Sequence, residues 1–149
     1  MRRLIIYILL FPVLVSVALW GCENKDTSQQ SIKTDIKPIM DRFPKLGEIQ
    51  KCVWSAETIG KQGGIGPTNY RLMGYVELRN TEFRLFLSKY KWTHVASDWK
   101  PTMDSKYIGT KPYSWSFSDE FNNFIKSSNY VGKFYLDTDN GVIYFEVER

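Results

Sequence analysis

An apolar run near the N-terminus is the feature that most constrains this chain. After Arg2 and Arg3, residues 4–19 are predominantly apolar, and Trp-Gly-Cys follows Leu19, ending at Cys22. A basic start, an apolar middle and a small residue before the cleavage point are typical of a secretory signal. The sequence therefore predicts a signal peptide over residues 1–21 and a mature chain that folds outside the cytoplasm.

The residues that end this run resemble the lipobox of bacterial lipoproteins. Leu19 stands three places before Cys22 and Gly21 directly precedes it, as in that motif, whereas Trp20 occupies a position that is usually small. The resemblance implies that Cys22 is diacylated on its sulfur and becomes the mature N-terminus. The expected location is the extracytoplasmic side of a membrane, in the periplasm or at the cell surface. The rest of the chain resembles only small lipoproteins of unknown function.

Two other interpretations of the N-terminal run stay open. An uncleaved membrane anchor would give the same topology, although 16 residues fall short of the roughly 20 that cross a bilayer as a helix, and Pro12 interrupts them. A soluble secreted protein would leave the position of Cys22 without an explanation.

The mature chain is long enough for one domain. Its 128 residues follow from the cleavage point, and the net charge of +4 falls to +2 once Arg2 and Arg3 are removed. So small a charge, together with the compartment, argues against a nucleic-acid partner. Cys52 would be the single cysteine not taken by the lipid, so no internal disulfide is expected. Its apolar neighbours predict a buried, inert side chain.

The chain after Cys22 divides into a tether and one α+β domain. Residues 22–31 comprise the lipidated cysteine and a polar segment without aliphatic or aromatic side chains, and residues 32–149 form the domain. Alternating patterns predict strands over residues 49–59, 70–78 and 92–99. Helical spacing predicts three helices, capped by Asp35, by Asn80 or Thr81, and by Ser116 or Ser118. The second of these has its apolar stripe at Phe83, Phe86, Leu87 and Tyr90.

A β-hairpin is expected at the C-terminus. Asn140-Gly141 between two alternating runs predicts a type I′ turn, with Asp139 opposite Val142 and Leu136 opposite Phe145. In this register the apolar residues share one side of the hairpin. The complete expectation is an antiparallel sheet of about five strands with two or three helices on one face.

Few residues suggest catalysis. His94 is the single histidine, which argues against a histidine zinc site, and the motif Gly-x-Ser-x-Gly is absent. His94 could orient a serine in a small hydrolase, with Ser97 or Ser55 as the nucleophile and Asp98 or Asp104 as the third member. The sequence favours a protein that is not an enzyme, with no catalytic residue, no metal and no cofactor.

Two loops have compositions that can suit ions. Residues 60–67 contain four glycines, but the loop lacks the Gly-Lys-Ser/Thr ending of a phosphate-binding loop and is better explained as a hairpin connection. Asp137, Asp139 and Glu148 are partly similar to a calcium loop, but the glycine falls one place early and both flanks are predicted strands. The hairpin explains the same residues.

Aromatic residues are the unusual feature of the domain. They make up 15% of the chain, and Trp99, Tyr107, Tyr113 and Trp115 lie in or beside an irregular segment. Tyrosine and tryptophan are enriched at binding surfaces, yet the same residues could close a core. We expect non-catalytic binding of a protein or envelope component through these four residues. A small-ligand or glycan-binding module is the alternative, and a hydrolase using His94 comes third.

Overall fold

The computed structural model describes residues 31–59 and 69–149. They form one antiparallel sheet of seven strands in the order β1-β2-β3-β7-β6-β5-β4, with three α-helices. The signal peptide, the lipidation of Cys22, most of the tether and the glycine-rich loop at 60–67 lie outside the described residues. No helix within the described ranges is long and apolar enough to cross a membrane.

The fold class and the C-terminal hairpin are confirmed. The number of strands is seven rather than five, because two strands are too short to produce an alternating pattern in the sequence. The strands are β1 Ile32–Lys33, β2 Ile49–Ile59, β3 Asn69–Leu78, β4 Thr93–His94, β5 Trp115–Phe117, β6 Val131–Asp137 and β7 Val142–Glu148. The helices are α1 Lys37–Arg42, α2 Asn80–Lys89 and α3 Asp119–Ile125, with 3₁₀ turns η1 Pro44–Leu46 and η2 Ser105–Tyr107.

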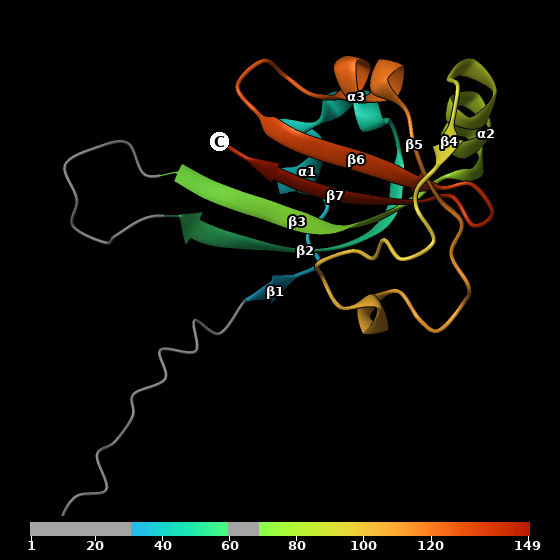
Figure 1. The fold of residues 1–149 in the computed structure, drawn as a ribbon. Coiled ribbons are helices and arrows are strands. Elements are labelled where there is room, and N and C mark those ends of the chain that lie inside the picture. The colour runs from blue at the N-terminus through green and yellow to red at the C-terminus, as the bar shows by residue number, and fades with distance from the viewer. Residues whose placement is uncertain (1–30, 60–68) are drawn as a thin grey trace, which may run out of the picture.

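All three α-helices pack on one face of the sheet, which we call the helix face (Figure 1). Phe43 follows α1, Phe86 lies in α2 and Phe121 lies in α3, and all three are at most 3% exposed. They cover alternate residues of the long strands, because successive side chains of a strand point to opposite faces. The strand residues of this cluster are Ile49, Cys52, Trp54, Leu72, Val76, Leu78, Phe134, Leu136, Ile143, Phe145 and Val147.

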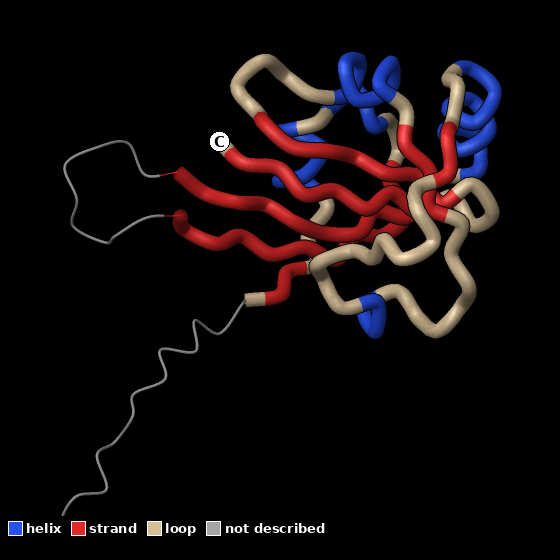
Figure 2. The backbone as a smooth tube through the Cα atoms, viewed as in Figure 1, coloured by secondary structure: helices blue, strands red, loops and turns tan. Residues whose placement is uncertain are grey.

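The opposite face of the sheet is covered by the long segment of residues 95–114, which we call the strap (Figure 2). Met103 of the strap is buried against Tyr75 of β3 and Tyr144 of β7. The Tyr75 hydroxyl donates a hydrogen bond to the Met103 carbonyl, which fixes the middle of the strap to the sheet. The central strands are therefore buried on both faces, and the second face, the strap face, is rich in aromatic residues.

The predicted caps Asp35, Asn80 and Ser118 lie within one residue of the observed caps, whereas the alternatives Thr81 and Ser116 are two residues away. Ser118 caps α3, since its Oγ accepts from the Phe121 N–H at 3.3 Å. The cap of α1 is Ile36 rather than Asp35, although Pro38 lies in the first turn as expected. In α2, which follows Arg79, Phe86 is buried as predicted, but Leu87 is 40% exposed and not a core residue.

The predicted strand over residues 92–99 is wrong beyond its first residues. Only Thr93 and His94 pair with β5. Trp92 packs in the helix-face cluster and donates from Nε1 to the Phe86 carbonyl at 3.0 Å, whereas Trp99 packs on the strap face. The chain must leave the sheet between these two tryptophans in order to cross from one face to the other.

The predicted hairpin register is wrong by two residues. Asp137, not Asp139, lies opposite Val142, and Phe134 faces Phe145. A type I′ turn needs positive φ at both central residues. Gly141 has φ 70°, but no non-glycine residue in the described part of the chain has a positive φ. A shift of two residues keeps every side chain on its predicted face, so the apolar side of the hairpin is correct.

Side chains of α3 and of its C-cap residue Lys126 complete the outer edge of β6, because β5 pairs only with the last three residues of β6. Asn122 is 3% exposed and contacts the Phe134 backbone twice, accepting from its N–H at 2.8 Å and donating to its carbonyl at 2.9 Å. Lys126 donates from Nζ to the Gly132 carbonyl at 2.7 Å. These two side chains supply the hydrogen bonds that a neighbouring strand would otherwise make.

Cys52 is buried, as predicted. Its side chain is 2% exposed on the helix face, and its Sγ lies 3.4 Å from the Asp35 carbonyl. Burial, with a smaller contribution from the Asp35 charge, raises the pKa of the Cys52 thiol to about 11. Because the thiolate is the reactive form, this cysteine is poorly suited to nucleophilic chemistry.

Candidate functional site

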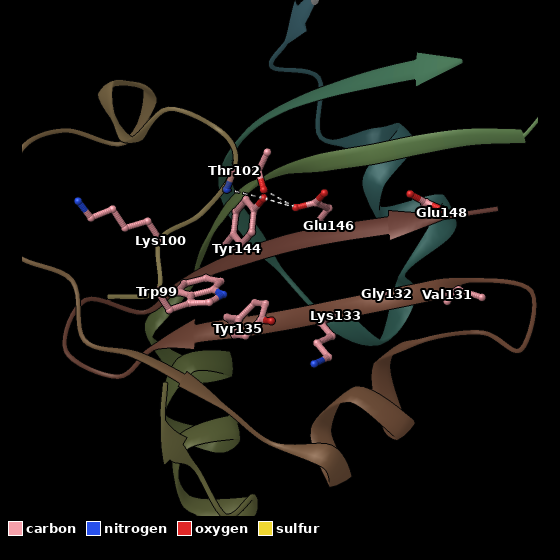
Figure 3. Close-up of a pocket in the computed structure, with 10 residues that line it drawn as sticks. All are labelled: Trp99, Lys100, Thr102, Val131, Gly132, Lys133, Tyr135, Tyr144, Glu146 and Glu148. Carbon is pink, nitrogen blue, oxygen red and sulfur yellow. Dashed lines mark hydrogen bonds between the residues drawn. The ribbon is translucent and has the colours of Figure 1, made fainter. Parts of the chain in front are cut away.

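A groove of about 300 Å³ opens on the strap face above β6 and β7 (Figure 3). We call it the β6–β7 groove. It is lined by Trp99, Lys100, Thr102, Val131, Gly132, Lys133, Tyr135, Tyr144, Glu146 and Glu148. Its volume lies at the lower end of the range of about 300 to 1,000 Å³ in which small molecules are usually bound.

An aromatic wall forms one end of the groove. The Trp99 ring lies 4.2 Å from the Tyr135 ring, and the two side chains are neighbours in Figure 3. Trp99 also meets Tyr144 and Trp115 edge-on, at 6.0 and 6.1 Å between ring centres. These contacts hold the half-buried Trp99 ring in place from several sides, so that its accessible part is preorganised.

A carboxylate held by three partners lies in the middle of the groove. Glu146 accepts hydrogen bonds from the hydroxyls of Tyr144 and Thr102, both at 2.9 Å (Figure 3). The Thr102 N–H donates to the Tyr144 oxygen at 3.2 Å, and Arg71 Nε lies 3.7 Å from the second carboxylate oxygen. Burial and the bond to Glu146 raise the pKa of Tyr144 to about 12, so its hydroxyl stays a donor at neutral pH.

A second groove lies on the other side of Trp99. It has a volume of about 420 Å³ and is lined by Trp99, Lys100, Pro101, Met103, Asp104, Ser105, Tyr113 and Trp115. We call it the strap groove. Because Trp99 and Lys100 belong to both linings, the two grooves meet at this point, and Trp99 stands between them.

The four residues predicted to bind come together in the strap-face cluster. Trp115 is only 9% exposed and stacks on Tyr113 with 5.5 Å between ring centres, so these two residues belong mainly to the core beneath the strap. Tyr113 also donates its hydroxyl to the Ile108 carbonyl at 2.7 Å. Tyr107 is half-buried beside Lys106 and lines neither of the two grooves. Trp99 is the predicted residue that both grooves share.

The sequence interpretation missed the contribution of the C-terminal hairpin. Tyr135 and Tyr144 pair across β6 and β7 on the side assigned to the polar face of the hairpin, and Glu146 lies on the same side. The signal was present, since two tyrosines on the polar side of both strands indicate a second covered face. No sequence pattern pointed to Thr102, because this residue reaches the groove only through the path of the strap.

His94 has a different partner from those predicted. Its Nδ1 lies 3.0 Å from the Oγ of Ser116, which is 1% exposed. Ser55 lies on β2, five strand positions from β4 across the sheet, so it cannot be oriented by His94. Asp104 is engaged within its own turn, where it accepts from the Lys106 N–H at 2.8 Å. The histidine and its buried serine form a contact at the β4–β5 edge.

The residues that are partly similar to a calcium loop do not come together. The Asp137 carboxylate is fully buried and accepts from Asn140 Nδ2 at 2.7 Å and from the Ser114 N–H at 2.8 Å. Glu148 lies at the far end of the hairpin and pairs with Arg71 at 2.7 Å. Across residues 31–59 and 69–149, no group of three or more His, Cys, Asp or Glu could hold a metal ion.

The β6–β7 groove is thus the site in which a fixed aromatic ring, hydroxyls and an anchored carboxylate face one cavity. This combination of an apolar surface with a few oriented polar groups is typical of ligand-binding sites. Comparison of the chain with protein-family models, with curated proteins and with solved structures gives no match.

Proposed function

We propose that this chain is a lipid-anchored, extracytoplasmic binding protein that is not an enzyme, and that it holds a protein or another envelope component in the β6–β7 groove. The observation that carries the proposal is the position of Trp99, packed 4.2 Å from Tyr135 and lining both grooves. The lipobox resemblance at Cys22 supports attachment to the membrane, which makes components of the envelope the accessible ligands.

The state of the polar groups supports binding over hydrolysis. Glu146 is engaged by Tyr144, Thr102 and Arg71, an arrangement that suits fixed recognition of a ligand better than proton transfer. The Ser116–His94 pair lies at the other side of β5 from Trp115, and its serine is buried. Neither partner of this pair lines the β6–β7 groove or the strap groove.

Replacement of Trp99 by alanine is expected to reduce partner capture about 30-fold or more. A central tryptophan of an interface contributes at least about 2 kcal/mol when it is a hot spot, and each 1.4 kcal/mol is about a tenfold change in affinity. The measurement is crosslinking in the native envelope, followed by affinity capture of the tagged full chain and quantitative mass spectrometry.

The matched control for this capture is Leu85→Ala. Leu85 is 54% exposed on α2, on the helix face, so its variant removes a comparable apolar side chain away from both grooves. Capture should be unchanged in this variant. If a folded Trp99→Ala protein captures its partner as well as the wild type does, the groove is not the contact surface.

A glycan or another small ligand is the second candidate. It is favoured by the two cavities of about 300 and 420 Å³ that meet at one indole ring, since aromatic faces bind the apolar faces of sugars while hydroxyls and carboxylates fix their orientation. Titration with soluble cell-wall fragments should change the tryptophan fluorescence of the wild type and of Trp92→Phe, but not that of Trp99→Phe. A response that persists in Trp99→Phe would locate the ligand elsewhere.

A further inference from the structure

Four side chains outside both grooves converge beside the end of β7, on the helix face of the sheet. The hydroxyl oxygens of Tyr70 and Tyr130 are 3.2 Å apart. The Arg149 guanidinium lies 5.8 Å from the centre of the Tyr130 ring, and both Arg149 and Arg42 interact with the Tyr70 hydroxyl. Reciprocal backbone hydrogen bonds between Tyr70 and Arg149, at 3.0 and 3.1 Å, hold these residues beside each other.

The two arginines bring positive charge, and neither pairs with an aspartate or glutamate side chain of the described residues. Among residues 31–59 and 69–149, the acidic side chains that form ion pairs contact Lys37, Arg71, Arg79 or Lys106, and none contacts Arg42 or Arg149. Arg42 donates to the Pro38 carbonyl at 2.7 Å, which orients its guanidinium without neutralising it. The cluster therefore contains two guanidinium groups that form no ion pair with an aspartate or glutamate side chain in the part of the chain that the structure describes.

Tyr70 responds to this charge, whereas Tyr130 responds mainly to its burial. The hydrogen bond from Tyr130, together with Arg149 and Arg42, lowers the pKa of Tyr70 although burial opposes the shift. Tyr130 is 6% exposed, and burial raises the pKa of its hydroxyl, which therefore remains protonated and can donate. The hydrogen bond from Tyr130 and the two arginines thus favour negative charge on the Tyr70 oxygen.

We propose that Tyr70, Tyr130, Arg42 and Arg149 form a binding site for the phosphate group of a phosphate ester. Arginine presents a planar fork of N–H donors that matches the oxygens of phosphate, and bonds between charged groups are stronger than neutral ones. One phenolic proton is used in the hydrogen bond between Tyr70 and Tyr130, and the other can serve as a further donor. The site lies on the opposite face from the β6–β7 groove, so it does not depend on the function proposed for that groove.

The test is calorimetric titration of the purified full chain with inorganic phosphate, in a nonionic detergent at low ionic strength. The double variant Arg42→Gln/Arg149→Gln should bind phosphate at least about 10-fold more weakly than the wild type, because two charge-assisted contacts are lost. The matched control is Arg79→Gln/Arg84→Gln, which removes the same two charges at the N-cap and on the surface of α2 and should bind like the wild type.

Equal phosphate binding by the wild type and the Arg42/Arg149 variant would overturn the proposal, as would the absence of binding by the wild type. Competition then identifies the source of the ester. Displacement of phosphate by a short-chain phosphatidylglycerol, but not by glycerol phosphate, would support a lipid head group, whereas the reverse would support a soluble or polymer-borne ester. Displacement by neither compound would contradict a phosphate-ester ligand.

Discussion

Replacing Asn122 by alanine is expected to lower the free energy of unfolding by about 3–5 kcal/mol. The Asn122 amide is buried and bonds to both the N–H and the carbonyl of Phe134, and it donates to the Ser118 carbonyl at 2.9 Å. Alanine would leave the Phe134 N–H and carbonyl without partners inside the protein, and each buried polar group left unsatisfied costs about 1–3 kcal/mol. Urea denaturation followed by tryptophan fluorescence measures the change.

The neighbouring Asn123 provides the matched control. It is exposed on the same helix, so Asn123→Ala should change the unfolding free energy by less than about 0.5 kcal/mol. A third variant, Asn122→Asp, keeps the size and an acceptor but removes the donor to the Phe134 carbonyl and adds a charge to be buried. It should also be strongly destabilised. Loss of less than about 1 kcal/mol in Asn122→Ala would mean that the amide is not what completes the edge of β6.

Replacing Gly132 by alanine is expected to cost about 4 kcal/mol or to prevent folding. Gly132 has φ 127°, a conformation that strains other residues by about 1–3 kcal/mol. An added Cβ would also lie 2.2 Å from the Glu146 carbonyl oxygen and 2.7 Å from the Val147 Cα, both backbone atoms of β7. Strands β6 and β7 would have to separate to admit it. Thermal and urea denaturation of the purified Gly132→Ala variant measure this loss of unfolding free energy.

A substitution at Gly109 separates the two causes of the Gly132 effect, which are backbone strain and the clash with β7. Its φ is also positive, at 97°, but an added Cβ would meet nothing within 4 Å. Gly109→Ala should therefore show the conformational strain alone, about 1–3 kcal/mol, and remain folded. If Gly132→Ala proves as mild as Gly109→Ala, then the clash of the added Cβ with β7 does not add to the cost of the substitution.

Much of the helix face could be predicted from the sequence, because its signals are local. The alternating pattern of residues 70–78 predicted strand β3, and Ser118, one of the two caps considered for the third helix, is the observed cap of α3. The two faces of the hairpin were predicted correctly, because the face of a strand residue depends only on whether its position is odd or even. The register was not, because Asp137 bonds to Asn140 and builds a four-residue loop where the sequence Asn-Gly predicted two residues.

The candidate site depends on contacts between distant parts of the chain, and this limits what the sequence predicts. Aromatic content directed attention to Trp99 and Trp115, but residue type does not distinguish a ring in a core from a ring at a groove. The bonds that fix Glu146 join Thr102 to β7 across 44 positions. No sequence periodicity shows that the strap crosses the sheet at this point, so the contact between Thr102 and Glu146 could be found only from the folded chain.

The hydrogen bonds from α3 to the edge of β6 also matter when many molecules of this protein lie on one membrane surface. Proteins tethered to a membrane, as proposed here, meet at high local concentration, and an unpaired strand edge is then a template for chain-to-chain polymerisation. Asn122 already occupies the N–H and the carbonyl of Phe134, and Lys126 occupies the carbonyl of Gly132. An incoming strand would have to displace them before it could pair with β6. The same side chains that stabilise one molecule therefore keep neighbouring molecules from joining at this edge.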